Sequence, residues 1–239
     1  VILGNSVNNH KWFGLLSSYR NRLDENFTLT AGFDGRYYRG DHYKEVYSLL
    51  GGQNFQSLLF QSQVDGGKTA LNKGDKYDYH NIGEVVWAGA FAQGEFTSEM
   101  FDAFLSGSLT YEGYRYLVPE GYSTTNHANF LSNPLYGPDF VKRTASDRVN
   151  LMPWSIKAGA SYKFLDYNNF FFNAGYFTRA PKFAGAFLNY STQVNKHLTN
   201  EKIMTVELGY GFQNEVFRAN LNGYFTKWDD RFLRRNSVL

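Results

Sequence analysis

The clearest pattern in this sequence is an alternation of apolar and polar residues with a period of two, which recurs over most of its length. Between residues 204 and 212 every second position is apolar or aromatic: Met204, Val206, Leu208, Tyr210 and Phe212. A similar run covers 217–226 and is separated from the first only by residues 213–215. Because successive side chains of a β-strand leave opposite faces, the period predicts two strands joined by a tight hairpin.

The same reasoning predicts about eight strands of roughly 11–16 residues each. They cover approximately residues 9–22, 27–43, 82–96, 101–112, 154–164, 170–178, 204–212 and 217–226. Short turns near 23–26, 97–100, 165–169 and 213–215 alternate with long polar connections near 46–81, 117–150 and 183–200. Glycine, asparagine and aspartate in these intervals are typical of turns and loops.

Alternation of short turns and long connections distinguishes two kinds of β-protein. Transmembrane barrels have strands of about 9–11 residues within the membrane, short periplasmic turns and long external loops, whereas soluble sandwiches mostly have shorter strands. The expected fold class is therefore all-β, an antiparallel up-and-down transmembrane β-barrel or a sector of one, with short periplasmic turns and long extracellular loops. A polar lumen side explains a mean hydropathy of -0.45 in a membrane protein. A soluble β-rich domain and a small self-closed barrel remain alternatives.

Composition excludes several classes of site. The chain has 239 residues and no Cys, which rules out a disulfide scaffold, a thiolate metal site and a cysteine nucleophile. A net charge of +2 gives no argument for a nucleic-acid partner. No run approaches the roughly 20 apolar residues of a membrane-spanning helix. No signal-peptide pattern follows Val1, so we expect the sequence to be an excerpt of a longer precursor.

Motifs for covalent chemistry are absent from the sequence. It contains no G-x-S-x-G elbow, phosphate-binding P-loop or H-E-x-x-H pattern, so we expect no enzyme, no cofactor and no metal site. His42 with Glu45 and His80 with Glu84 are expected to be surface pairs on or beside loops. A metal site would need three or four converging ligands.

Candidate binding residues are concentrated in the connection 117–150, where aromatic rings stand beside amide and imidazole groups. This mixture is common in recognition loops. The candidate ligand-binding residues are Tyr122, Asn126, His127, Phe130 and Tyr136. The alternative is an external loop with no ligand role.

Charged residues also fall on the polar side of the predicted strands. They are Asp34, Arg36, Glu112, Lys157, Glu207 and Arg218. These side chains either line a path through the lumen or form a charge ladder that solvates it. Arg179 and Pro181 are expected to be structural and to mark the point where the sixth strand leaves the barrel wall, because proline cannot donate to the ladder.

Residues 168–232 resemble a known family. Residues 177–181, FTRAP, resemble the "FRAP" segment of TonB-dependent outer-membrane receptors, and 195–202, NKHLTNEK, are similar to their "NPxLKPE" segment. Residues 207–210 match their "ELGY" strand, and 219–230, ANLNGYFTKWDD, are similar to the strand that follows. Order and spacing agree as well as residues.

The resemblance is strongest over 168–232 and compatible over 10–165, and residues 10–45 and 153–188 resemble receptors of Bacteroidetes-type bacteria. Two departures concern loop shape. Lys196 and Asn200 stand where the family has proline, and 184–187, AGAF, replace the usual "ELY".

Family membership would imply a 22-stranded barrel of which this chain supplies about eight strands. Residues 1–239 would then be part of one barrel domain, with the plug domain and the C-terminal strands absent from the sequence. The resemblance further implies a location in the bacterial outer membrane and active uptake of a scarce nutrient (an iron chelate, cobalamin, glycan or peptide) energised through TonB.

The implied partners are the TonB complex, reached through the plug domain, a small nutrient ligand and outer-membrane lipids; a surface lipoprotein is an open option. No nucleic acid is expected. Two alternatives remain at this point: a passive porin or structural outer-membrane barrel, and a soluble β-rich adhesion or carbohydrate-binding module.

Overall fold

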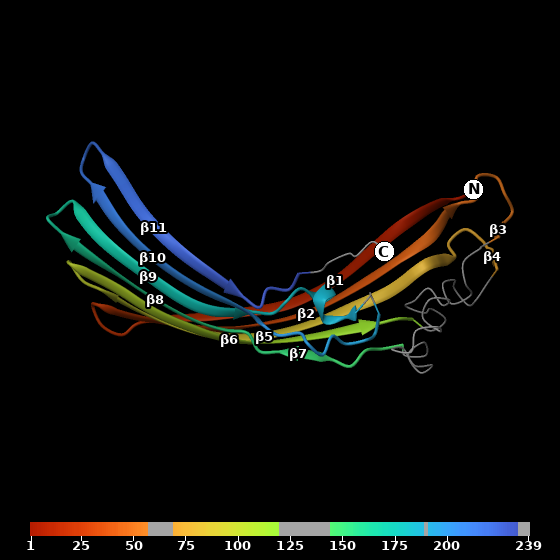
Figure 1. Ribbon diagram of the computed structural model, residues 1–239, viewed down its shortest axis with the longest axis horizontal. Helices are drawn as coiled ribbons and strands as arrows, with labels where there is room; N and C mark the ends of the chain where they lie inside the picture. Colours follow the sequence, from red (N-terminus) through yellow and green to blue (C-terminus); the bar gives the residue numbers. More distant parts are fainter. Residues whose placement is uncertain (57–68, 120–143, 189–190, 234–239) are drawn as a thin grey trace.

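The computed structural model describes residues 1–56, 69–119, 144–188 and 191–233, which form one long antiparallel sheet and a two-stranded hairpin (Figure 1). The main sheet runs in the order β1-β2-β5-β6-β8-β9-β10-β11, and β7 pairs with β6 beside this path. Apart from β7 and the small hairpin, each strand pairs with the next one along the chain. The all-β, up-and-down prediction is therefore confirmed. Within the described residues the barrel is not closed, and β1 and β11 are the edges of the sheet.

The predicted strands all occur. They are β1 (Leu3–Arg22), β2 (Phe27–Ser48), β5 (Lys76–Thr97), β6 (Phe101–Leu117), β8 (Trp154–Phe164), β9 (Asn168–Arg179), β10 (Glu201–Gln213) and β11 (Arg218–Asp229). The shorter elements are β3 (Phe55–Gln56), β4 (Ala70–Leu71), β7 (Val149–Leu151) and the helical turn α2 (Phe183–Ala186). Several of the predicted limits are wrong: β1 begins before residue 9, β6 continues five residues beyond 112, and β2 and β5 both extend into the predicted connection 46–81.

In Figure 1 the short turns lie at the left end of the sheet, and the hairpin β3–β4, which belongs to the connection between β2 and β5, lies at the right end. Side chains fix the tight turns. The Asp24 carboxylate accepts hydrogen bonds from the backbone N–H groups of Asn26 and Phe27 at 2.8 and 2.7 Å. At the last hairpin, Asn214 Oδ1 accepts from the N–H groups of Val216 and Phe217 at 3.0 and 2.7 Å. Such side-chain closure is why Asp and Asn occur at these positions.

Strand registers divide the side chains into two faces, which we call the outer face and the inner face. In one row of the register, Leu208 lies beside Phe172 and Gly223, and Phe172 lies beside Ala160. The large apolar residues of this outer face are exposed, for example Leu208 at 62%, Leu105 at 57% and Phe33 at 51%. This exposed apolar band is the surface that a barrel presents to lipid.

The apolar band has a limited height. Along the outward-facing positions that follow the short turns, the last apolar residue of the band is Tyr37 on β2 and Val86 on β5. These two residues are paired in the register. Beyond them β2 and β5 continue to Ser48 and Lys76 with polar residues on both faces. These extensions therefore rise beyond the part of the wall that is suited to lipid.

Aromatic rings cover glycines on the inner face. A Cβ atom added to Gly209 would meet the Phe171 ring at 2.0 Å, and one added to Gly159 would meet the Phe104 ring at 2.4 Å. In the register, Gly209 is paired directly with Phe171 and Gly159 directly with Phe104. Glycine leaves room for the ring of the adjacent strand, which accounts for the joint enrichment of glycine and phenylalanine.

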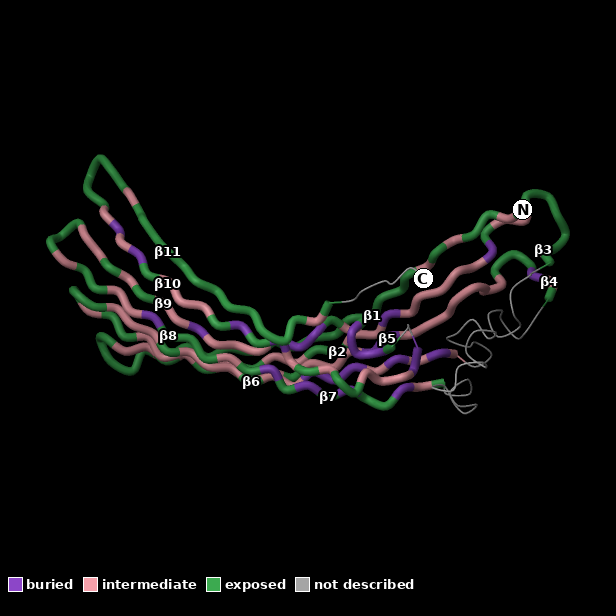
Figure 2. Tube along the Cα trace, in the orientation of Figure 1, coloured by how far each residue is buried: buried purple, intermediate pink, exposed green. Residues whose placement is uncertain are grey.

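Buried residues gather near β6, β7 and α2 rather than along the whole sheet (Figure 2). Tyr114, Tyr116 and Val149 form the centre of this core, with Ala186 and Phe187 packed on them. A second, smaller core holds Val46 and Leu71 beneath the hairpin β3–β4. None of the described helices is long and apolar enough to cross a membrane.

Candidate functional site

The connection between β9 and β10 turns back onto the inner face of the wall. We call residues 180–188 and 191–200 the inner strap. The Phe183 ring lies 5.7 Å from the Tyr114 ring and 6.3 Å from the Tyr116 ring, centroid to centroid. The Phe187 ring lies 5.6 Å from Tyr116. Such ring pairs hold the strap against β6, which is distant in sequence.

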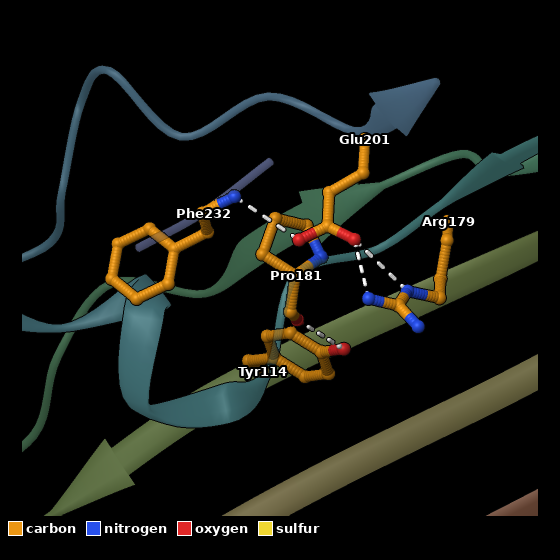
Figure 3. Close-up of polar contacts among 5 residues, drawn as sticks. All are labelled: Tyr114, Arg179, Pro181, Glu201 and Phe232. Atoms are coloured by element: carbon orange, nitrogen blue, oxygen red, sulfur yellow. Dashed lines mark hydrogen bonds and ion pairs between the residues drawn. The ribbon is translucent and has the colours of Figure 1, made fainter. Parts of the chain in front are cut away.

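Both ends of the strap are fixed by an ion pair. Arg179, the last residue of β9, donates from Nε and Nη2 to Glu201 Oε2 at 3.0 and 2.5 Å (Figure 3). Glu201 opens β10 and its side chain is only 4% exposed. Its other oxygen accepts the backbone N–H of Phe232 at 3.1 Å. The register pairs Arg179 with Glu201 directly, so the loop begins and ends at one place on the wall.

A second contact links the strap to β6. The Tyr114 hydroxyl lies 3.2 Å from the carbonyl oxygen of Pro181 and 2.6 Å from Oε2 of Glu112, and both atoms are acceptors. Figure 3 shows the Tyr114 side chain directed at Pro181, close to the Arg179–Glu201 pair. The structural role expected for Arg179 and Pro181 agrees with β9 ending at Arg179.

A cavity of about 270 Å³ lies between the strap and the wall. Its lining is mainly apolar and aromatic, with one imidazole, two phenols and one amide; the residues are Tyr38, His42, Asn81, Gly83, Val85, Tyr116, Phe183, Ala184 and Phe187. They come from β2, β5, β6 and the strap, at the end of the sheet that carries the long connections. We call this the strap pocket. Aromatic walls with a few polar groups are typical of small-molecule sites.

His42 supplies a polar wall of the strap pocket. Its Nδ1 lies 2.6 Å from Asn8 Oδ1. An amide oxygen only accepts, so Nδ1 carries the proton and Nε2 is left as an acceptor in the neutral ring. The His10 ring stands 5.3 Å away, edge to face. Burial lowers the pKa of His42 below its usual value, and the nearby His10 lowers it further, against an opposing effect of Asp41.

The expectation for the histidine–glutamate pairs was wrong in its details. His42 and His80 lie within strands β2 and β5, not in loops, and neither is bonded to the glutamate first paired with it. His80 Nε2 donates to Asp41 Oδ1 at 2.8 Å on the outer face. In the described ranges, no three His, Asp or Glu side chains converge as a metal site would require.

The five predicted ligand-binding residues, Tyr122, Asn126, His127, Phe130 and Tyr136, lie outside the described residues. The described stems of their loop are paired, since the Val118 N–H donates to Thr144 O and the Ser146 N–H donates to Tyr116 O, both at 2.8 Å. Tyr116 therefore connects this loop with the strap pocket.

The charged residues expected on the lumen side do share the inner face. In the register, Arg36 lies beside Trp87 and Trp87 beside Glu112. Glu207 accepts from Asn173 at 3.2 Å and from Asn222 at 2.8 Å, so its charge is held by amides of two neighbouring strands. Asp34, Lys157 and Arg218 fall on the same face by their register positions.

Sequence reasoning missed the strap pocket because its residues come from four separate segments. Phe183 and Phe187 stood in a connection that was expected to be a loop, and His42 was taken as a surface residue. The one local signal was the apolar sequence AGAF at 184–187, which is unusual for a solvated loop.

Residues 3–238 match the family model described as "TonB dependent receptor-like, beta-barrel". No curated protein matches the sequence. Among solved structures, the fold is similar to that of the copper transporter OprC, with a TM-score of 0.63 and 16% sequence identity. The similarity covers 95% of this chain and 32% of the OprC chain, so the chain spans about a third of that protein's length.

Proposed function

We propose, from the fact that this chain belongs to the family of TonB-dependent receptor β-barrels, that the whole protein takes up a scarce nutrient with energy supplied through TonB. The family consists of outer-membrane proteins of Gram-negative bacteria, and this chain is an outer-membrane protein. Its membership excludes the soluble adhesion or carbohydrate-binding module. The family is one of transporters and receptors, and the proposed activity needs no covalent step.

Within this function, the described strands form a sector of the barrel wall. We take the end with short turns as periplasmic and the end with long connections as extracellular, as barrels of this kind are built. The inner face would then line the lumen, and its charged and amide side chains would contact the plug domain. The TonB complex would act through that domain.

We propose that the strap pocket binds part of the ligand. It opens on the inner face near the long connections and is lined by Tyr38, Tyr116 and the two strap phenylalanines, with His42 as an acceptor. About 270 Å³ is too small for a whole cobalamin or glycan chain, but it accommodates one ring of a larger ligand. We therefore propose that the pocket holds an aromatic or sugar ring of the nutrient.

The predicted loop 117–150 completes the site in this proposal. Tyr122, Asn126, His127, Phe130 and Tyr136 would approach the ligand from the extracellular side, since the stem of the loop ends at Tyr116 in the pocket wall. A surface lipoprotein would cover the same end where one is present.

The test uses cells whose growth on a limiting iron chelate, cobalamin, glycan or peptide depends on the full-length protein. Tyr116→Leu removes a pocket ring and should weaken binding of that nutrient about tenfold. Tyr162→Leu is the matched control, because Tyr162 is 51% exposed on the outer face near the short turns. Equal binding by both variants and the wild type would contradict the assignment of the pocket.

A further inference from the structure

The upper border of the apolar band on the outer face is basic. On each strand, we followed the outward-facing positions from the short turn toward the long connections and noted the first charged residue. These residues are Lys11 on β1, Arg39 on β2, Glu84 on β5, Arg115 on β6, Lys202 on β10 and Lys227 on β11. β8 and β9 have no charged outward-facing residue. Five of these six residues are cations.

The lower border has the opposite charge. The short turns contain Asp24, Glu25, Glu99, Asp166 and Glu215, and residues 23–26, 98–100, 165–167 and 214–217 include no Lys or Arg. The charge asymmetry therefore runs across the apolar band, from acidic turns to a basic rim beneath the long connections.

Three cations of this rim, Lys11, Arg39 and Arg115, lie close together. Lys11 pairs with Arg39, Arg39 with Glu84, and Glu84 with Arg115 in the register, on strands that lie about 4.8 Å apart. Arg148 lies beside them. Its Cδ is 3.3 Å from the position that a Cβ on outward-facing Gly113 would take. The pairing of Val149 with Tyr114 also places Arg148 next to Arg115. We call Lys11, Arg39, Arg115 and Arg148 the basic row.

The basic row has one internal anion. Glu84 binds Arg39 at 2.5 Å and accepts from the Tyr37 hydroxyl at 3.1 Å. Within the part of the chain that the structure describes, no carboxylate lies at ion-pair distance from Lys11, Arg115 or Arg148. Lys11 and Arg148 are exposed. Like charges held close together repel, so an external anion would stabilise the row.

We propose that the basic row docks the phosphate groups of an anionic lipid in the outer leaflet, such as phosphorylated lipid A. One register step below the row lie Phe13, Tyr37 and Val86, the top of the apolar band. A lipid with its phosphates on the row would lay its acyl chains along that band. Guanidinium groups bind phosphate with two parallel hydrogen bonds, which suits the three arginines of the row. The inference does not depend on what the protein transports.

The experiment uses the full-length protein in phosphatidylcholine nanodiscs, with diphosphoryl lipid A as the probe. Native mass spectrometry counts bound lipid A for the wild type, for Arg115→Gln with Arg148→Gln, and for Lys157→Gln. Lys157 is the matched control because it is a cation on the inner face. The double variant should retain about thirtyfold less lipid A, since each of the two basic residues near an anionic surface contributes about 1 kcal/mol. The control should retain the wild-type amount.

Two further samples make the result decisive. Dephosphorylated lipid A should bind the wild type as weakly as diphosphoryl lipid A binds the double variant. Lys11→Gln alone should cause a smaller loss, which guards against misfolding of the double variant. Undiminished lipid binding by the double variant, or equal binding of the dephosphorylated lipid by the wild type, would each overturn the proposal.

Discussion

Glu201 has the most demanding environment of any carboxylate at the strap. It is buried, and three N–H groups from Arg179 and Phe232 satisfy its two oxygens. Glu201→Ala would leave the Phe232 N–H and the guanidinium without this acceptor. We expect a loss of about 2–3 kcal/mol in the free energy of unfolding, measured by urea denaturation in detergent.

Glu95→Ala provides the control for that variant. Glu95 pairs with Arg20 at 3.1 Å, but the two side chains are 32% and 69% exposed. An exposed pair of this kind contributes less than about 1 kcal/mol. Similar losses for both variants would show that the buried pair has no special role in holding the strap.

Gly209 tests the packing of rings over glycines. A side chain at this position would collide with the Phe171 ring, so Gly209→Val should lower stability by about 1–3 kcal/mol. Adding Phe171→Ala should recover part of the loss. Gly35→Ala should be nearly neutral, because a Cβ there meets nothing closer than Trp87 O at 3.9 Å. A stable Gly209→Val protein without the second change would contradict this packing.

His42 gives a prediction for pH. Its pKa is lowered in the folded protein, so the unfolded chain binds a proton at a higher pH than the folded one does. Stability is then greatest above the usual pKa of about 6.5 and is lost as pH falls through the lower folded value. His42→Gln should reduce this decline in the thermal midpoint between pH 7 and 5. An identical decline in the variant would assign it to other groups.

At the scale of elements, the strands were predictable where one face meets lipid and the other does not. The alternation is clear from Phe27 to Tyr37 and disappears beyond it, where Arg39 and Asp41 also face outward. The sequence analysis therefore missed the extensions of β2 and β5, because a strand with polar residues on both faces shows no alternation of apolar and polar positions. β3, β4 and β7 are two or three residues long and too short to produce a pattern.

The strap was unpredictable for a different reason. Its fold depends on contacts between Phe183 or Phe187 and Tyr116, which lie more than sixty residues away in the sequence and meet only when the sheet has formed. The family motif near Arg179 located its start, but no local pattern indicated that the segment turns inward. The same long-range dependence hid the strap pocket.

Release of the strap provides a prediction at this scale. Phe183→Ser with Phe187→Ser removes the rings that contact β6, and the strap should then become accessible to trypsin at Lys182 and Lys196 in isolated outer membranes. Leu188→Ser is the control, since Leu188 is 37% exposed. Mass spectrometry of the fragments identifies the cut. Full resistance of the double variant would mean that the backbone contacts suffice to hold the strap.

At the scale of the whole molecule, the described sheet is open and does not close on itself. β1 and β11 both present an unpaired edge and expose apolar side chains, and further strands would be needed to close a barrel around the inner face. That residues 1–239 form part of a single barrel domain stays a prediction. The fold class was predicted from the alternation of side chains together with the strand lengths and the order of short and long connections. The substrate was not predicted, because side-chain alternation carries no information about ligand contacts.

Energised uptake is the central claim, and accumulation of the required nutrient by intact cells tests it most directly. Cells carrying the full-length protein are compared with and without a protonophore, and with and without TonB. We predict that surface binding persists in every sample, while accumulation falls to the level of cells that lack the protein when the proton gradient or TonB is removed. Accumulation that continues without either would contradict the account and indicate a passive porin.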